Sequence, residues 1–263
     1  KNLGGTTATK NWAEGAWSDY RGYPAAVALH EARLWWAGKD RVDGSIVDAY
    51  NSMDKAFEGD AGPISRSIGT GPVDKLRWMM SGQRLLVGGQ GNAWVIKSSS
   101  LDEPITPTNF NLKPAASRGS AAVSAVLVDH AVVFVDRSGG RAYELAPDAY
   151  GTYSPSELST IVPEIGEPGI VRIAAQTQPD TRIHFVRSDG KVAVLVYDKN
   201  EEVRCWLLVE TDGLVEDVVV LPGESISEDN VYYVVARTIG GATKRYLEKW
   251  ALGSEAVVAG GGS

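Results

Sequence analysis

The chain has 263 residues, of which 43% are hydrophobic, so it is long enough to bury a sizeable core as one all-β domain or two average domains. Its 26 Lys and Arg residues and 33 Asp and Glu residues give a formal net charge of −7 and a pI near 5.1. An acidic balance of this kind argues against nucleic acid or an anionic membrane as the main partner. No apolar run reaches the roughly 18 residues that a membrane span needs, and no signal peptide is visible.

The chain divides into an N-terminal arm (1–21), a repetitive region (22–251) and a Gly-rich C-terminal tail (252–263). It begins without Met, and we expect it to be a piece of a longer protein. The arm mixes Gly and Thr with Trp12 and Trp17 and carries no clear period. A single cysteine, Cys205, excludes an internal disulfide and a cysteine-based zinc site, and we expect it to be a buried apolar residue.

A short apolar run recurs five times in the repetitive region. The copies are 33–38 (RLWWAG), 84–88 (RLLVG), 131–135 (AVVFV), 182–186 (RIHFV) and 230–234 (NVYYV). A fixed period of this size indicates a repeat architecture, and the aromatic and branched residues suit a strand buried on both faces. The equivalent positions are separated by 51, 47, 51 and 48 residues, and they are Leu34, Leu85, Val132, Ile183 and Val231.

Each run lies in a similar unit of predicted strands joined by turns. In the first unit, strands are expected at 25–31, 33–37 and 45–47, and Gly and Asp-Gly turns supply the positive φ angles that tight hairpins require. Fourth strands are expected at 63–68, 108–112 and 203–209. A short helix is expected at 155–161, because Ser154 is a suitable N-cap, Pro155 a suitable first residue, and Glu157 follows three residues after the cap.

Antiparallel units of three to four strands, repeated about every 50 residues, predict an all-β, propeller-like fold of five blades. A β-sandwich would instead place turns roughly every 8–12 residues without a long period. A sixth blade could be assembled from the two ends of the chain. In the predicted propeller, the aromatic and aliphatic side chains of the repeated runs should be buried between blades, namely Trp36, Leu86, Phe134, Phe185 and Tyr233.

Few residues have the spacing of a catalytic or metal site. His30, His130 and His184 fall in separate units, and His30-Glu31 lacks the second His of a zincin helix, so structural roles are expected. The acidic run 198–202 resembles a calcium loop but lacks its central Gly and distal Glu, which favours a solvated turn. We therefore predict no catalytic, cofactor-binding or metal-binding residues.

Acidic and aromatic residues leave one alternative open. Carboxylates that meet near a propeller axis could form a glycosidase pair, and the sequence alone does not show whether they meet. The candidates are Asp43, Asp74, Asp136 and Glu144. Trp35 and Trp36 alternate across a strand, which favours core packing over a platform for sugars.

Two stretches carry a family resemblance. The first consists of Gly22-Tyr23-Pro24, 33–38 (RLWWAG), 42–45 (VDGS), Tyr50 and Phe57. The second consists of Gln178-Pro179, 183–190 (IHFVRSDG), 195–197 (LVY), 203–206 (VRCW) and 211–213 (TDG), and Thr106-Pro107, Gly119-Ser120 and 133–135 (VFV) fall between the two in a similar order. Together they resemble the tail tubular protein B, or nozzle, family of short-tailed bacteriophages and its hub-like relatives.

The resemblance covers roughly residues 22–250 and implies a virion component of the phage tail that is not an enzyme. Members of the family are usually much longer, contain a propeller-like region and form rings around the tail axis with other tail proteins. This chain lacks their flanking tail-tube regions, and the family has no catalytic residues or cofactors to transfer. Two alternatives stay open: a carbohydrate-binding or glycan-cleaving propeller, and a cellular propeller scaffold that binds a peptide.

Overall fold

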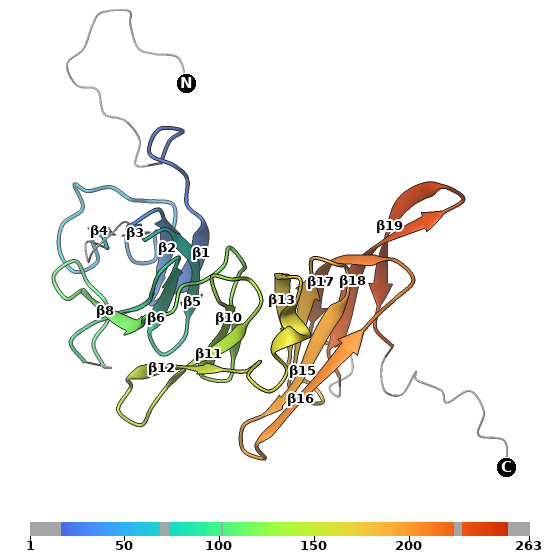
Figure 1. The fold of residues 1–263 in the computed structure, drawn as a ribbon. Helices are drawn as coiled ribbons and strands as arrows, with labels where there is room; N and C mark the ends of the chain where they lie inside the picture. Colours follow the sequence, from blue (N-terminus) through green and yellow to red (C-terminus); the bar gives the residue numbers. More distant parts are fainter. Residues whose placement is uncertain (1–16, 69–73, 101, 224–227, 252–263) are drawn as a thin grey trace, which may run out of the picture.

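A computed structural model describes residues 17–68, 74–100, 102–223 and 228–251. Within these residues the chain forms nineteen strands in five antiparallel sheets, together with one short 3-10 helix, η1 (Pro163–Gly166). The five sheets stand one after another in chain order, with the first and last sheets at opposite ends of the row (Figure 1). No helix in the described part of the chain is long and apolar enough to cross a membrane.

Each sheet is a meander in which strands pair in sequence order. The first contains β1 (Ala26–His30), β2 (Arg33–Gly38), β3 (Arg41–Gly44) and β4 (Ile64–Ser67). The second contains β5 (Leu76–Ser81), β6 (Leu85–Gly89), β7 (Ala93–Lys97) and β8 (Asn111–Ala116). The third contains β9 (Val126–Val128), β10 (Ala131–Val135), β11 (Ala142–Pro147) and β12 (Tyr153–Glu157).

The last two sheets follow the same plan. The fourth contains β13 (Ile170–Gln176), β14 (Arg182–Arg187), β15 (Val192–Asp198) and β16 (Val203–Val209). The fifth contains only β17 (Leu214–Leu221), β18 (Asn230–Ile239) and β19 (Ala242–Lys249). The repeated run is the second strand of every sheet, so the predicted all-β, propeller-like fold with five units of antiparallel strands is confirmed.

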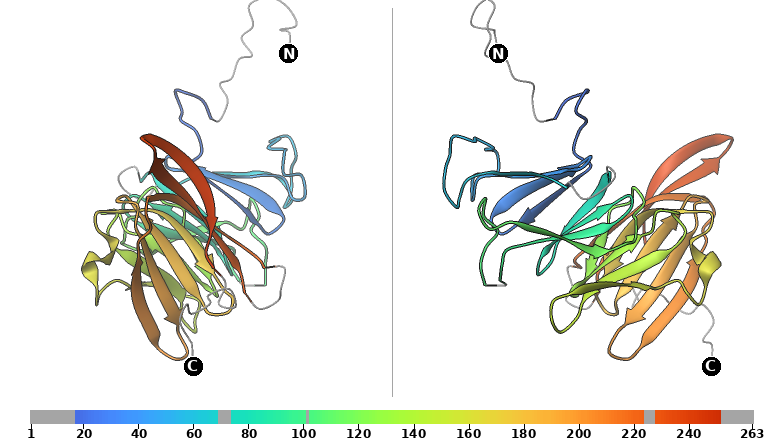
Figure 2. Two further views of the ribbon diagram at one scale, coloured as in Figure 1. Left: turned by 90° about the vertical axis from the view of Figure 1, so that its right-hand side faces the viewer. Right: turned by 60° about the vertical axis from the view of Figure 1, so that its left-hand side comes forward.

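Buried apolar clusters fill the spaces between consecutive sheets. Trp35 belongs to the cluster between the first and second sheets, and Phe134 to that between the second and third. Phe185 lies between the third and fourth sheets, and Tyr233 between the fourth and fifth. Stacking of this kind buries both faces of the inner sheets, and each fully buried large apolar side chain contributes about 1.5–3 kcal/mol. Figure 2 shows the sheets stacked in this order from two further directions.

The structure corrects the predicted third strand of the first unit. The pairing of Gly38 with Arg41 closes a two-residue turn at Lys39-Asp40, where Lys39 has a positive φ of 49°. The third strand therefore begins directly after this turn, at Arg41, rather than at 45–47. The Gly/Asp turn expected between 37 and 45 is therefore confined to Lys39-Asp40, and Gly44 lies within β3, where its missing Cβ leaves room for the Trp35 ring.

The predicted helix at 155–161 is wrong. Residues Tyr153–Glu157 form β12, in which Pro155 pairs with Leu145 of β11. β12 is an edge strand, where a proline without a backbone N–H is tolerated, and Tyr153 is buried in the cluster between the second and third sheets. Burial of Tyr153 and pairing with β11 therefore override the local capping pattern, and the only helical turn in the described residues is η1.

The expectation that Cys205 is buried is also wrong, because the structure shows it exposed. β16 is the outer strand of the fourth sheet, and alternation places Cys205 and Trp206 on opposite faces. Trp206 points inward, with its ring centroid 5.2 Å from that of Phe185, so Cys205 points outward. Of the predicted arm, only the part from Trp17 is described, and the predicted tail (252–263) lies outside the described residues.

Candidate functional site

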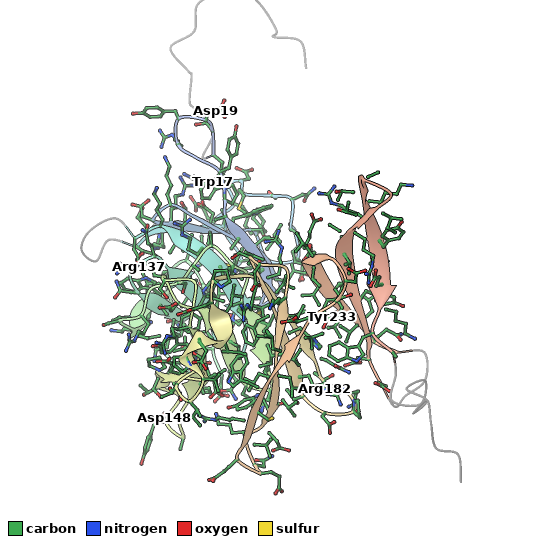
Figure 3. All side chains as sticks on the ribbon, turned by 45° about the vertical axis from the view of Figure 1, so that its right-hand side comes forward. Trp17, Asp19, Arg137, Asp148, Arg182 and Tyr233 are labelled. Atoms are coloured by element: carbon green, nitrogen blue, oxygen red, sulfur yellow. The ribbon has the colours of Figure 1, made fainter. Side chains whose placement is uncertain are left out.

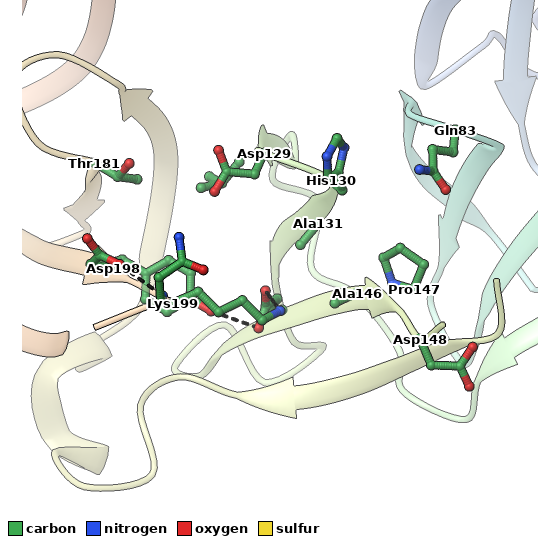
Figure 4. Close-up of a pocket in the computed structure, with 14 residues that line it drawn as sticks. Gln83, Asp129, His130, Ala131, Ala146, Pro147, Asp148, Thr181, Asp198 and Lys199 are labelled. Carbon is green, nitrogen blue, oxygen red and sulfur yellow. Dashed lines mark hydrogen bonds and ion pairs between the residues drawn. The ribbon is translucent and has the colours of Figure 1, made fainter. Parts of the chain in front are cut away.

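A cavity that carries ionisable groups opens between the second, third and fourth sheets (Figure 4). Its volume is about 650 Å³. Gln83, His130 and Thr181 come from the turns that join the first and second strands of these three sheets, so these turns lie on one face of the molecule. Its acidic and basic groups come from β11 and β15 and from the residues directly after them, namely Glu144, Asp148, Asp198 and Lys199, and Asp129 comes from the β9–β10 turn.

Glu144 is the most buried charged group of this cavity, with 3% of its surface exposed. One of its carboxylate oxygens accepts a hydrogen bond of 3.0 Å from the Tyr197 hydroxyl, and the other accepts one of 2.9 Å from Lys199 Nζ. Both donors belong to the fourth sheet, whereas Glu144 lies on β11 of the third. The group therefore connects two sheets across their interface (Figure 4).

Burial, together with the nearby Glu144 carboxylate, raises the pKa of Tyr197 to about 12. The phenol stays protonated at neutral pH and donates to Glu144. A catalytic carboxylate or phenol needs a proton that it can release or accept near the working pH. Because Tyr197 holds its proton and Lys199 neutralises the carboxylate, this arrangement favours a structural link between sheets.

Two of the three remaining carboxylates of the cavity, Asp148 and Asp198, hold its turns in place. Asp148 Oδ1 accepts backbone N–H groups of Tyr150 and Thr152, both at 2.8 Å. Asp198 Oδ1 accepts those of Asn200 and Glu201 at 2.9 and 3.0 Å, which makes the run 198–202 an exposed turn. The prediction of a solvated turn here is confirmed.

The other three carboxylates proposed from the sequence lie in separate local hydrogen-bond sets. Asp43 pairs with Arg41 at 2.7 Å, and Asp74 accepts the backbone N–H groups of Gly91 and Asn92 at 2.7 and 2.9 Å. Asp136 accepts the Ser138 hydroxyl at 2.7 Å in the turn after β10. Of the four candidates only Glu144 lines the cavity, so the structure does not bring them together as a pair.

Two of the three histidines connect neighbouring sheets, as the structural interpretation expects. His30 Nδ1 lies 2.9 Å from Ser81 Oγ, between the first and second sheets. His184 Nδ1 lies 2.7 Å from the Tyr233 hydroxyl, between the fourth and fifth. His130 is exposed and lines the cavity. Within the described ranges, no three His, Cys, Asp or Glu side chains are grouped so that they could hold a metal ion.

Sequence reasoning did not foresee the meeting of Glu144 with Tyr197 and Lys199. These residues are more than fifty positions apart, and neither the 195–197 stretch nor the 198–202 run, which contain the two partners, indicates a contact with Glu144. One signal was present: Glu144 is a charged residue between the apolar Tyr143 and Leu145 in a buried strand, where a charge needs a partner.

The stacked antiparallel sheets, with the cavity on the face that their turns form, define a β-propeller-like protein. No protein-family model matches the chain, and the search of curated proteins found no match. Among solved structures, one similar chain comes from the Saccharomyces cerevisiae complex of Dbp5 with Nup159, Gle1, IP6 and ADP, at a TM-score of 0.48 and 9% identity; the match covers 86% of this chain and 61% of that one. Another is YCF48 from Cyanidioschyzon merolae, with a TM-score of 0.44, 10% identity and coverage of 86% and 71%.

Proposed function

We propose that this chain is a structural and assembly module of a bacteriophage tail, similar to a nozzle or hub-like component, and that it is not a catalyst. Its partners are then other tail proteins, including further copies in a ring formed by the whole protein, and its location is the tail of the virion. The observation that carries the proposal is architectural. The residues on which the phage resemblance rests occupy turns and contacts between sheets.

The stretch 183–190 illustrates this role. Arg187 Nη2 donates to Asp189 Oδ2 at 2.6 Å and fixes the turn before β15. Gly190 follows with a positive φ of 78°, a conformation that glycine adopts at no steric cost. A Cβ at Gly190 would also lie 2.7 Å from the Leu214 side chain of the fifth sheet, so glycine allows the two sheets to approach closely.

Gln178-Pro179 connects the same two sheets. The Gln178 carbonyl accepts the Gln176 side-chain amide at 2.7 Å and the Asp229 backbone N–H at 3.2 Å. Asp229 Oδ2 in turn accepts the backbone N–H groups of Thr177 and Gln178 at 2.8 and 3.0 Å. The motif therefore joins the β13–β14 turn to the β17–β18 connection.

In the first stretch, Arg33 has the same kind of role. The residue is 1% exposed, and its guanidinium donates to the carbonyls of Ser45, Asp60 and Gly62, each at 2.6 Å. One side chain thereby holds both ends of the long 45–62 connection against the first sheet. These contacts support an architectural function for the residues on which the phage resemblance rests.

The test is localisation in the virion. Antibodies against the chain, bound to purified particles of the phage that encodes it and imaged by cryo-electron microscopy, should mark the tail. Unlabelled particles, obtained while the protein is abundant in the infected cell, would overturn the proposal. A glycoside, ester and phosphate substrate screen of the purified chain should give no turnover above a blank.

A glycan-binding or glycan-cleaving propeller is the second candidate, and one observation favours it. Four carboxylates line the cavity of Figure 4, namely Asp129, Glu144, Asp148 and Asp198. Polysaccharide hydrolysis that is lost in Asp148→Asn or Asp198→Asn, but kept in Asp136→Asn outside the cavity, would favour this candidate over the structural one.

A further inference from the structure

Side chains on the second strand of each sheet alternate between the two neighbouring sheets. Phe134, Phe185 and Tyr233 are equivalent positions, and each faces the sheet that precedes its own. His184 and Tyr232 stand one residue before Phe185 and Tyr233 in their strands, and His184 faces the sheet that follows its own. By the same alternation, the face of the first sheet that carries Trp36 and the face of the last sheet that carries Tyr232 have no neighbouring sheet among the described residues.

On the first sheet this face is apolar and hollow. Trp36 is equivalent to Phe134, Phe185 and Tyr233, which are all buried, yet it is only partly buried. Val27, its direct neighbour across β1, is 51% exposed, and Leu29 on the same face is 61% exposed. Trp36 also lines a pocket of about 500 Å³ with Trp17 and Met53. The expectation that Trp36 is buried between blades is thus not met, because no described sheet precedes its own.

Asp43 lies beside Trp36 on β3 and also lines this pocket. The residue is 5% exposed, and its Oδ1 accepts from Arg41, but its Oδ2 has no hydrogen-bond partner among the described residues. A buried carboxylate oxygen without a donor is costly, so a covering surface should supply one. This pocket is separate from the cavity between the sheets: Figure 3 shows Trp17 and Asp148, which line the two, at opposite ends of the molecule.

The outer face of the last sheet also carries exposed apolar side chains, together with Arg245 and Lys249 of β19. Val219, Leu221 and Leu247 are 44%, 49% and 68% exposed. Register places Val219 beside Tyr232, and Leu247 beside Val234, on the face opposite to the buried Tyr233. Exposed apolar patches of this kind mark interaction sites in soluble proteins. Both ends of the row therefore present the type of face that the inner sheets bury.

We propose that both faces are interfaces for further antiparallel sheets of the same propeller, supplied by polypeptide outside these 263 residues. Each of the four interfaces between consecutive sheets packs one sheet face against the next, and the two outer faces are the next positions in that series. Each unit takes 47 to 51 residues, so each covering sheet would need a segment of about that length. The inference concerns completion of the fold and does not depend on the phage assignment.

The inner interfaces show what the covering sheets must offer. Trp78 of the second sheet lies 5.6 Å, centroid to centroid, from Phe134 of the third, and His184 lies 2.7 Å from the Tyr233 hydroxyl. The sheet that covers Trp36 should therefore bring an aromatic side chain with an N–H or O–H donor toward Asp43. The sheet that covers Tyr232 should bring aliphatic or aromatic side chains toward Leu247.

Cysteine accessibility tests the proposal. In a Cys205→Ser background, Val27→Cys and Leu247→Cys report on the two faces, and Tyr150→Cys, at a position 94% exposed in a turn of the third sheet, is the control. In the 263-residue chain all three should react rapidly with a maleimide. In the native polypeptide, expressed from its complete coding sequence, the first two should react at least tenfold more slowly, and the control at an unchanged rate.

Two results would overturn the inference. One is equal labelling of Val27→Cys and Leu247→Cys in both proteins. The other is protection that is already present in the 263-residue chain and increases with its concentration, because a second copy would then cover the faces. Tryptophan fluorescence of the variants before labelling would confirm that each retains its fold.

Discussion

His184 Nδ1 and the Tyr233 hydroxyl oxygen lie 2.7 Å apart across the interface between the fourth and fifth sheets. His184 is fully buried, and its ring also stands edge-on to Trp250 at a centroid distance of 5.4 Å. Burial, with a smaller contribution from Arg182, lowers the pKa of His184 to about 4. Burial likewise raises the pKa of Tyr233. Both groups are therefore neutral at pH 7, and the interface depends on that state.

The first prediction is that acid destabilises the fold through His184. The unfolded chain takes up this proton near pH 6.5 and the folded chain only near pH 4, so stability is full above pH 6.5 and falls as the pH drops toward 4. The loss should be on the order of 3 kcal/mol for this residue. Urea denaturation at pH 7.5 and pH 4.5 measures it.

His184→Gln is the control, because glutamine hydrogen-bonds without titrating in this range. Its stability should depend less on pH than that of the wild type. Some dependence should remain, since burial also lowers the pKa of His30. Identical slopes for the variant and the wild type would contradict the assignment to His184.

The second prediction concerns the core between the second and third sheets. Phe134 is fully buried, and its ring centroid lies 5.6 Å from that of Trp78 and 5.9 Å from that of Tyr143. Phe134→Ala should cost roughly 3–5 kcal/mol in reversible denaturation, through lost burial and the cavity that remains. Tyr150→Ala, at an exposed position, should change stability by less than about 0.5 kcal/mol. A cost below about 1 kcal/mol for Phe134→Ala would mean that this interface is loosely packed.

The third prediction concerns Arg33 and the 45–62 connection. Arg33→Met keeps much of the apolar stem but leaves the carbonyls of Ser45, Asp60 and Gly62 without their donor. The expected cost is roughly 2–4 kcal/mol, with faster proteolysis within 45–62. Arg33→Lys should be intermediate, because an ammonium cannot match the planar guanidinium fork. If limited proteolysis cuts elsewhere first in Arg33→Met, Arg33 does not hold this connection.

The fourth prediction tests the link between the third and fourth sheets. Tyr197→Phe removes the 3.0 Å hydrogen bond to Glu144 and leaves that carboxylate oxygen buried without a donor. The free energy of unfolding should fall by about 1–3 kcal/mol. Tyr150→Phe alters a phenol that is 94% exposed and should have almost no effect. Equal stabilities of the two variants would show that the hydrogen bond contributes little.

The sequence determined the local parts of this protein. The recurring run, marked by Leu34 and Val132 among others, predicted the second strand of all five sheets, and the short apolar runs around Phe134 and Phe185 predicted burial. These features depend on neighbours one to a few residues away, which the sequence contains directly. A local pattern also misled where tertiary contacts were stronger, since the capping signature at Ser154 to Glu157 lies in an edge strand that pairs with β11.

Only the tertiary structure decided which side chains meet between units. Glu144 reaches Tyr197 across 53 positions, and no spacing in either unit indicates that contact. Trp36 shares its place in the repeat with Phe185, yet one is partly exposed and the other fully buried. The physical reason is that a sheet's burial depends on the sheets stacked against its two faces. The sequence of a unit specifies its strands, whereas the neighbour that covers each face is set by the order of the whole row.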